Sequence, residues 1–448
     1  MGVRRLVLAL VTGVAVAAGS TVLAALPGSA AVACSGVTWS EGPTYTAGQQ
    51  VTYNAHLYQA LVTHTAWAGA GWNPASTPTL WKDLGACTGG PTTPPVTTPP
   101  VTTPPVTTPP VTTPPVTTPP VTTPPATTPP ATGCAVKGRP AGKVLQGYWE
   151  NWDGASNGVH PGMGWIPIND SRITQHGYNV LMAAFPVIRS DGTVLWENGM
   201  DAGVKVPTAA EICAAKAAGA TVLMSIGGAT AGVDLSSAAV ADRFVATIVP
   251  ILKQYNFDGI DIDIETGLTG GGNINTLSTS QANLIRIIDG VLAQMPANFG
   301  LTMAPETAYV TGGSVTYGSI WGSYLPIIKK YLDNGRLWWL NMQYYNGSMY
   351  GCSGDSYSAG TVQGFTVQTQ CLNNGLTIQG TTIRIPYDKQ VPGLPAQPGA
   401  GGGYMTPSLV TQAYNSVPGI KGLMTWSINW DGSKSWTFGD NVKRLQGR

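Results

Sequence analysis

The stretch Asp258-Gly259-Ile260-Asp261-Ile262-Asp263-Ile264-Glu265 decides the fold of most of this 448-residue chain. Its isoleucines alternate with acidic residues, and side chains two positions apart on a β-strand point to the same face. As a strand, the stretch therefore turns its isoleucines to one side and Asp261, Asp263 and Glu265 to the other. In a barrel, these three acids would form a ladder on the inside.

Strand-like and helix-like segments alternate on both sides of this stretch. Helix-like segments with Pro or Gly near their ends occur at 209–218, 239–255 and 281–295. The strand candidates are residues 144–148, 179–185, 221–227, 259–265, 300–306, 338–345, 383–387 and 422–426. Eight βα units in about 310 residues predict a (β/α)8 TIM barrel. A doubly wound open sheet is the alternative, but no Gly-rich phosphate loop follows the first strand.

The three acids are candidates for catalysis because they lie close together. Neighbours on one face of a strand are about 6 to 7 Å apart, and burial at this spacing disfavours ionisation of all three carboxyls. One carboxyl can then stay protonated near neutral pH. Glu265 comes last, at the strand end where barrel enzymes place their active sites. A salt-bridged or metal-binding row is the alternative, but the segment has no Lys, Arg or His. Asp258 is out of phase with the ladder and is expected to be structural.

The octapeptide resembles the D-x-x-D-x-D-x-E signature of glycoside hydrolase family 18 chitinases. Four other strand ends agree with that family: Ser-Ile-Gly-Gly at 225–228, Met-Ala-Pro-Glu at 303–306, Met-Gln-Tyr-Tyr-Asn at 342–346 and Met-Thr-Trp-Ser at 424–427. The Gln and Asn in the third of these segments are similar to the hevamine-like branch. Gly227 and Gly228 are expected to permit a close backbone approach rather than to contact sugar.

The resemblance implies retaining hydrolysis in which the substrate, rather than an enzyme nucleophile, attacks the anomeric carbon. Glu265 would protonate the glycosidic oxygen while the 2-acetamido carbonyl forms an oxazolinium ion. Asp263 would orient the acetamide and share a proton with Asp261, and Tyr345 would bond the acetamide oxygen. The other implied substrate contacts are Tyr148, Gln343, Asn346, Met303, Glu306 and Trp426, the last as an apolar floor.

A second, smaller body precedes the barrel. Between Gly90 and Thr132 the sequence collapses to Val-Thr-Thr-Pro-Pro repeats, which predict an extended spacer on the order of 120 Å long. We therefore expect a linker at 88–133 between a module at 34–87 and a catalytic body at 134–448. The module is too small to be held by a core alone, so a disulfide between its ends and a few short antiparallel strands are expected.

This small body resembles a carbohydrate-binding module of family 5/12, the kind attached to bacterial chitinases. The matching landmarks are Trp39, Tyr45-Thr46-Ala47-Gly48, Val51-Thr52-Tyr53, Leu57-Tyr58-Gln59-Ala60 and Trp81-Lys82-Asp83-Leu84-Gly85. The resemblance implies that chitin stacks in the region from Trp67 to Trp72, with Tyr45 as a further candidate contact. Trp39, Tyr53 and Trp81 are expected in the core.

The first 33 residues are typical of a secretory signal. They hold an Arg pair at 4–5, an apolar stretch at 6–18 and Ala-Val-Ala at 31–33. A membrane anchor is the alternative, but Gly and Thr interrupt the apolar stretch. An exported protein with six cysteines is expected to form three disulfides. Order along the chain suggests Cys34–Cys87, Cys134–Cys213 and Cys352–Cys371, among fifteen possible connectivities.

The composition favours a neutral polymer as partner. Lys and Arg number 23 against 22 Asp and Glu, which gives no footprint for nucleic acid or for an anionic membrane. The chain has 14 Trp and 17 Tyr, whose flat faces suit stacking on sugar rings. Chitin and chito-oligosaccharides are the expected partners of a secreted monomer. No cofactor is indicated, because no Cys or His cluster has metal-ligand spacing.

Three alternative functions remain open. In a two-carboxylate retaining glycosidase, Glu306 would be the nucleophile, about 5 to 5.5 Å from Glu265. A sugar-binding protein without turnover would use the same barrel but typically lacks the acid. An endo-acting enzyme that cuts the core of N-glycans would share the ladder. Among chitinases, endo cleavage in an open cleft is expected, because no large insertion separates the seventh and eighth strands.

Overall fold

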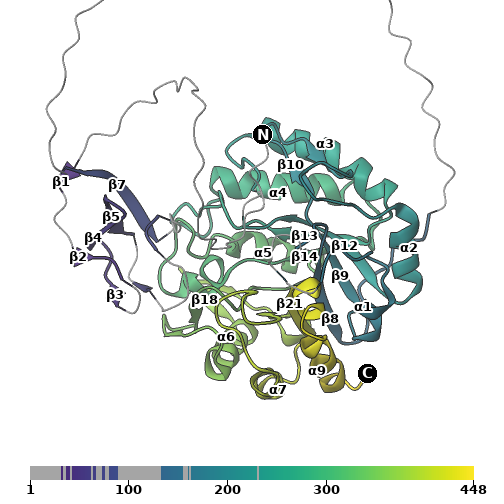
Figure 1. The fold of residues 1–448 in the computed structure, drawn as a ribbon. Helices are drawn as coiled ribbons and strands as arrows, with labels where there is room; N and C mark the ends of the chain where they lie inside the picture. The colour runs from purple at the N-terminus through teal and green to yellow at the C-terminus, as the bar shows by residue number, and fades with distance from the viewer. Residues whose placement is uncertain are drawn as a thin grey trace, which may run out of the picture. The chain divides into compact units, whose positions relative to one another are not determined.

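The structure is a computed structural model. It describes residues 32–33, 37–40, 43–61, 64–66, 73–75, 80–88, 133–154, 160, 163–229 and 232–448. The chain divides into two compact units, and the boundary between them falls between Thr132 and Gly133 (Figure 1). In the described residues no helix combines the length and the apolarity needed to cross a bilayer.

The larger unit is a closed barrel of parallel strands. Its strands are β8 (Val144–Glu150), β9 (Val180–Ala184), β12 (Thr221–Gly227), β13 (Gly259–Asp263), β14 (Gly300–Met303), β15 (Trp339–Leu340), β20 (Gly393–Pro395) and β21 (Gly422–Trp426). They pair in the order β15-β14-β13-β12-β9-β8-β21-β20. Parallel bridges join Leu340 to Gln390 and Gln343 to Gly393, so the first and last strands of this order also meet. The predicted (β/α)8 barrel is confirmed, and the open sheet is excluded.

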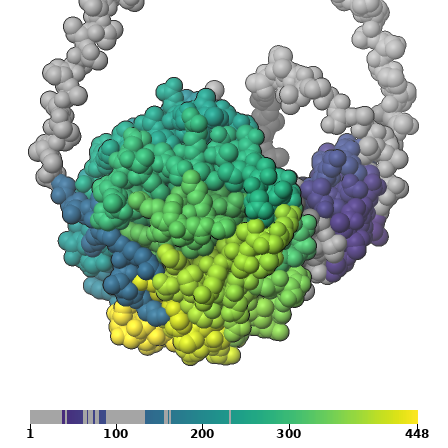
Figure 2. Space-filling view, turned by 180° about the vertical axis from the view of Figure 1, so that it is seen from behind, coloured from purple at the N-terminus to yellow at the C-terminus, as the bar shows by residue number. Residues whose placement is uncertain are grey.

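Helices surround the barrel (Figure 1). They are α1 (Ser171–Gln175), α2 (Ala209–Ala217), α3 (Ala238–Gln254), α4 (Thr279–Leu292), α5 (Leu325–Asp333), α6 (Val362–Asn374), α7 (Pro407–Ser416), α8 (Ile428–Gly432) and α9 (Thr437–Leu445). Capping boxes begin α2 and α4, with Thr208 facing Glu211 and Ser278 facing Gln281. The unit's two ends lie side by side, because β8 pairs with β21 and the blue and yellow residues touch in Figure 2.

The strands divide their side chains between two apolar clusters. The cluster between strands and helices holds Ile260, Ile262 and Ile264, together with Leu301 and Met303. The cluster inside the barrel includes Tyr148, Phe185, Ala304, Tyr345 and Met424, with Trp152 and Trp426 packed against it. The isoleucines of β13 thus face the helices, and its acids face the barrel interior as predicted.

The seventh strand is not where the sequence pattern placed it. Residues 383–387 are not a barrel strand, because Ile383 ends the short hairpin of β18 (Leu376–Ile378) and β19 (Thr381–Ile383). Tyr387 then begins the 3-10 turn η3 (Tyr387–Lys389). The seventh strand is β20, whose Gly-Leu-Pro sequence has little intrinsic strand propensity. Residues 396–421, between β20 and β21, hold α7 and no inserted domain.

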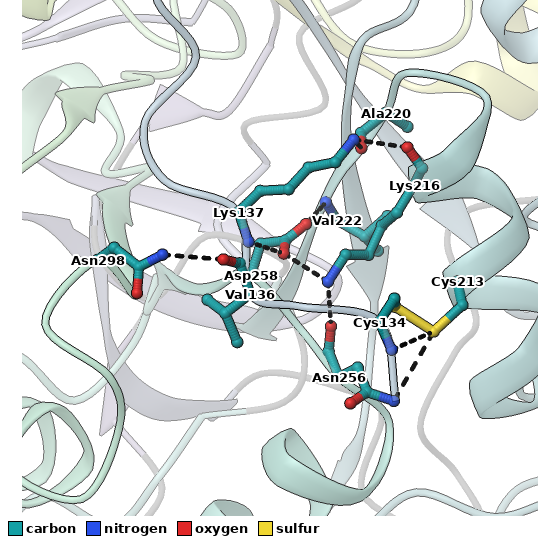
Figure 3. Close-up of polar contacts among 10 residues, drawn as sticks. All are labelled: Cys134, Val136, Lys137, Cys213, Lys216, Ala220, Val222, Asn256, Asp258 and Asn298. Carbon is teal, nitrogen blue, oxygen red and sulfur yellow. Dashed lines mark hydrogen bonds and ion pairs between the residues drawn. A yellow bond between two sulfur atoms is a disulfide. The ribbon is translucent and has the colours of Figure 1, made fainter. Parts of the chain in front are cut away.

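Asp258 is structural, as expected, and anchors the start of the barrel unit (Figure 3). Its carboxylate lies 2.6 Å from the Lys216 ammonium, and both side chains are almost fully buried. It also accepts the backbone N–H groups of Lys137, at 2.7 Å, and Val222, at 2.9 Å. The Lys137 ammonium bonds the carbonyls of Lys216, at 2.5 Å, and Ala220, at 2.7 Å. The first residues of the barrel unit are thereby fixed to the N-terminal end of β13.

Two predicted disulfides are confirmed, Cys134–Cys213 beside this cluster and Cys352–Cys371. Cys87 is also disulfide-bonded. Its predicted partner, Cys34, lies outside the described residues, as do residues 1–31 of the predicted signal.

The smaller unit is a β module. Its main sheet holds β1 (Val32–Ala33), β7 (Trp81–Thr88), β5 (His56–Ala60), β4 (Gln50–Tyr53) and β2 (Val37–Thr38), and β3 (Thr44–Tyr45) pairs with β6 (His64–Thr65). The pairs β4-β5, β5-β7 and β3-β6 are antiparallel. Val32 and Ala33, part of the predicted signal, pair with Cys87 and Thr88.

One predicted chitin contact, Tyr45, is instead buried in the core of the module. Tyr45 is only 3% exposed, its ring lies 5.0 Å from that of Trp81, and its hydroxyl bonds Ser40. A side chain used in this way offers no face to a sugar. Trp81 is buried as expected, and Trp39 and Tyr53 pack against the same core. Trp67 and Trp72 lie outside the described residues.

Candidate active site

The acid ladder runs from the barrel interior to its C-terminal mouth. Asp261 and Asp263 are buried on β13, and Glu265, two residues beyond the strand, is partly exposed. The inner acid is therefore sealed among protein groups, while the outer one can meet a ligand.

Asp261 is the most heavily hydrogen-bonded acid of the ladder. One carboxylate oxygen accepts from the hydroxyls of Tyr148 and Ser225, each at 2.7 Å. The other accepts from the Thr302 hydroxyl, at 2.6 Å, and from the Asn341 amide, at 3.1 Å. Burial raises the pKa of Asp261, and these four donors oppose the shift. The arrangement suits a carboxylate that keeps its charge, because ionised carboxylates only accept hydrogen bonds.

Asp263 and Glu265 share one amide donor. The side-chain nitrogen of Gln343 lies 3.0 Å from Asp263 and 2.8 Å from Glu265. Burial, Glu265 and Asp261 together raise the pKa of Asp263 well above its usual range. Burial raises the pKa of Glu265 to about 7, which is the range that suits a general acid working near neutral pH.

Glu306 lies just beyond β14 in the same group of acids. Burial and the charge of Glu265 raise the pKa of Glu306 to about 8. A carboxyl that keeps its proton at neutral pH is a poor nucleophile. The raised pKa of Glu306 therefore disfavours the alternative in which Glu306 attacks the anomeric carbon.

An aromatic floor faces these acids. The ring of Trp426, at the end of β21 and partly exposed, lies 5.4 Å from that of Tyr148, 5.9 Å from Phe185 and 6.1 Å from Trp152. Tyr345 joins the same interior cluster. Burial and the neighbouring carboxylates raise the pKa of Tyr345, so its hydroxyl keeps a proton to donate. The floor offers an apolar face beside a hydroxyl donor, which suits a sugar ring.

Behind Trp426, a buried ion pair joins the ends of β8 and β21. Glu150 accepts from His160 Nε2 at 2.6 Å and from the hydroxyl of Ser427, the residue after Trp426. His160 Nδ1 lies 2.8 Å from the Met163 carbonyl oxygen, so both ring nitrogens face acceptors and the doubly protonated ring is favoured. Burial works to lower the pKa of His160, but the bond and charge of Glu150 raise it overall.

Two glycines bring the third strand close to the ladder, as expected. Gly227 has φ +109°, and a Cβ atom there would lie 2.1 Å from the carbonyl oxygen of Asp263. The N–H of Gly228 donates to that same oxygen at 2.7 Å. The backbone of β12 thus fixes the position of Asp263.

Three predicted substrate contacts have other roles in the structure. Met303 lies in the cluster between strands and helices, so it faces away from the site, and its prediction as a contact is wrong. Tyr148 is only 1% exposed and supports Asp261 from below. The side-chain oxygen of Asn346 accepts the N–H of Gly402 at 2.7 Å.

Several residues of the site were missed by the sequence reasoning. They are Ser225, Thr302 and Asn341 around Asp261, and Trp152 and Phe185 in the floor. Strand alternation could have predicted one of them, because Asn341 is in phase with Gln343 and Tyr345 and so faces the same side. Ser225 stood within the quoted Ser-Ile-Gly-Gly segment without a role.

Comparisons with known proteins agree with this geometry. Residues 38–82 match "Carbohydrate-binding module family 5/12", and residues 144–346 match "Glycosyl hydrolases family 18". Endochitinase 37 of Trichoderma harzianum is 82% identical over 309 residues, which are 69% of this chain and 92% of that protein. Endochitinase 4 of Metarhizium robertsii is 80% identical over 311 residues, 69% of this chain and 90% of that protein.

A solved structure covers more of the chain. The family GH18 chitinase from Chromobacterium violaceum is 30% identical with a TM-score of 0.60, and the match covers 92% of this chain and all of that one. Because the barrel, its acid ladder and these relatives agree, we conclude that the chain belongs to glycosyl hydrolases family 18, with a family 5/12 carbohydrate-binding module that precedes the barrel in the sequence.

Proposed function

We propose that this protein is a secreted chitinase that hydrolyses β-1,4 bonds between N-acetylglucosamine units with retention of configuration. The observation that carries the proposal is the placing of Glu265. Its carboxyl, with a pKa raised to about 7, lies at the mouth of the barrel beside buried Asp263 and shares the Gln343 amide with it.

In the first step, Glu265 gives its proton to the glycosidic oxygen as the bond from that oxygen to the anomeric carbon breaks. The carbonyl oxygen of the sugar's own acetamide attacks the anomeric carbon and forms an oxazolinium ion. Asp263 accepts the acetamide N–H and stabilises the positive charge, while Tyr345 donates its hydroxyl to the acetamide oxygen. Trp426 packs against the apolar face of the sugar.

In the second step, Glu265 acts as a base. It takes a proton from water as the water oxygen attacks the anomeric carbon, which opens the oxazolinium ring and restores the acetamide. Two inversions at the same carbon give net retention. Before the reaction, the charge of Asp261 favours a protonated Asp263. The proton of Asp263 passes to Asp261 as the acetamide N–H arrives, so that Asp263 accepts this N–H as a carboxylate, and the proton returns to Asp263 when the product leaves.

The choice of chitin draws on two further observations. Relatives named endochitinases are about four-fifths identical over most of their length, and the family 5/12 module supports attachment to an insoluble polymer. Endo cleavage is supported by residues 396–421, which hold α7 and no inserted domain that would enclose the candidate active site. We expect mid-chain fragments early in a digest, whereas a dominant dimer from the first minute would contradict endo action.

The decisive test is Glu265→Gln in the full chain. A Gln cannot deliver the proton, so turnover of a chromogenic chitobioside should fall about 100- to 10,000-fold. Binding to chitin should persist, since the module is unchanged. Unchanged turnover would remove Glu265 from its role, and a naturally inactive wild type would favour a sugar-binding protein.

A thiazoline mimic of the oxazolinium ion separates the remaining mechanisms. It should inhibit the wild type without a covalent label. A 2-fluoro-glycoside that labels Glu306, seen by mass spectrometry, would instead establish the two-carboxylate mechanism. Turnover of a glycoprotein N-glycan in preference to chito-oligosaccharides would move the substrate away from chitin.

A further inference from the structure

Asn346, at the mouth of the barrel, is bound to Gly402 in two places. Its backbone N–H donates to the carbonyl oxygen of Gly402 at 2.9 Å, and its side-chain oxygen accepts the N–H of Gly402 at 2.7 Å. Asn346 has φ +61°, a left-handed conformation that Asn adopts more readily than most residues. The side chain of Asn346 is therefore hydrogen-bonded to the backbone of a loop.

The same contact holds the backbone around Tyr345 from both sides. On the preceding side, the N–H of Tyr344 donates to the carbonyl oxygen of Gly393 at 3.0 Å. On the following side, Asn346 is joined to Gly402. Tyr345 is thus carried on a short segment tied at each end to the chain that forms and follows β20.

The loop at residues 399–403 has the sequence Gly-Ala-Gly-Gly-Gly, and it packs against the tyrosine ring. A Cβ atom at Gly401 would lie 3.2 Å from a ring carbon of Tyr345 and 3.3 Å from the side-chain oxygen of Asn346. A Cβ atom at these distances would require the Tyr345 ring or the Asn346 side chain to shift by a few tenths of an ångström. The loop therefore forms one wall of the space that Tyr345 occupies.

No described residue forms a hydrogen bond with the Tyr345 hydroxyl, although the charges of Asp263 and Glu265 act on it. Its position must therefore come from the packing of the ring and from the backbone that carries it. A displacement of about 1 Å in a reacting group can cost on the order of 100-fold in rate. Whatever fixes the ring of Tyr345 is thus expected to influence catalysis.

We propose that Asn346 is a positioning residue, which binds Gly402 and so holds the loop at 399–403 against Tyr345. The inference rests on the proposed function, in which Tyr345 bonds the substrate acetamide. It assigns Asn346 an action through Tyr345 instead of the direct substrate contact that the sequence suggested.

A double-mutant cycle tests this assignment. Asn346→Ala and Tyr345→Phe are made singly and together in the full chain, and kcat and KM are measured on a fluorogenic chitobioside. If Asn346 acts through Tyr345, N346A should lower kcat about 10-fold in the wild type but less than about 2-fold in the Y345F background. KM should change little, because the loss falls on a bond that matters most at the transition state.

Three variants refine the cycle. Asn346→Asp keeps an acceptor for the Gly402 N–H and should retain most of the activity, whereas Asn346→Gly keeps the backbone conformation alone and should not. Gly401→Ala alters the same contact from the loop, because its methyl group would press on the Tyr345 ring. It keeps the test informative if N346A folds poorly. Gly401→Ala should also lower kcat in the wild type and have little effect in Y345F.

The outcomes separate this inference from the proposed function. Equal losses from N346A in both backgrounds, or no loss in the wild type, would overturn the role of Asn346 while leaving the hydrolase mechanism standing. Full activity of Y345F would overturn both, because Tyr345 would then need no positioning. Failure of N346D to rescue would also contradict the proposed contact with Gly402.

Discussion

The side-chain amide of Gln343 bonds Asp263 and Glu265 at once, at 3.0 and 2.8 Å. Both bonds favour the ionised carboxylates and so lower two pKa values that burial raises. Gln343 therefore tunes the acid as well as holding it.

Gln343→Ala should move the alkaline limb of the pH profile upward. The wild type should lose kcat/KM as pH rises through about 7, where Glu265 gives up its proton. Without the amide donor, the pKa of Glu265 rises further, so protonated enzyme persists to higher pH. We expect a lower maximum, by roughly 10- to 100-fold, because the carboxyl is also less well placed. An alkaline limb that stays in place while the maximum falls would mean that Gln343 only positions the acids.

Glu306→Gln should be far milder than Glu265→Gln. Glu306 has a pKa raised to about 8, so near pH 6.5 it is mostly protonated and a neutral Gln resembles it. We expect kcat/KM within about 10-fold of the wild type at that pH, since uncharged polar contacts are largely kept. The two variants are matched in charge and shape. Equal loss of turnover in both would show that Glu306 takes part directly in the chemistry.

His160→Gln should destabilise the protein most at acidic pH. Glu150 raises the pKa of His160 in the folded state, so this contribution to stability is full below the unfolded pKa of about 6.5. It is lost as pH rises through the folded value. The difference in melting temperature between wild type and variant should therefore shrink as pH rises from 5.5 to 9. A difference that does not depend on pH would show that the ring acts by packing alone.

Asp258→Asn should be strongly destabilising, because it leaves the Lys216 ammonium buried without its carboxylate. Breaking one partner of a buried pair costs about 3–5 kcal/mol. The matched control is Asp242→Asn, which removes an exposed pair with Arg286 and should cost far less, because exposed ion pairs contribute little to stability. Urea unfolding of the full chain compares the two. Similar losses would mean that the charge of Asp258 contributes little, since the Asn oxygen replaces only one of the two carboxylate oxygens that accept from Lys137 and Val222.

Side-chain alternation predicted the barrel well where strands are regular. β12 and β21 have the predicted limits, and β13 turns Asp261 and Asp263 inward. β20 was not predicted because Gly393-Leu394-Pro395 has no alternating pattern. It is a strand because it pairs with a neighbouring strand on each side. Tertiary contacts can override weak local propensity in this way.

Register explains the missed supports of Asp261. Ser225 and Thr302 are its partners on the two neighbouring strands, but a single sequence does not state how those strands are aligned. Met303 was assigned from its motif, although alternation on β14 puts Thr302 inside and Met303 outside. The acids could be predicted because they lie on one strand, whereas their donors come from several.

The anchoring of Lys137 at Asp258 also decides where the chain enters the barrel. Asp258 and Glu265 lie beyond opposite ends of β13, so the chain enters the barrel at the end opposite its candidate active site. A substitution at residues 133–137 therefore acts on the barrel from the side away from its acids.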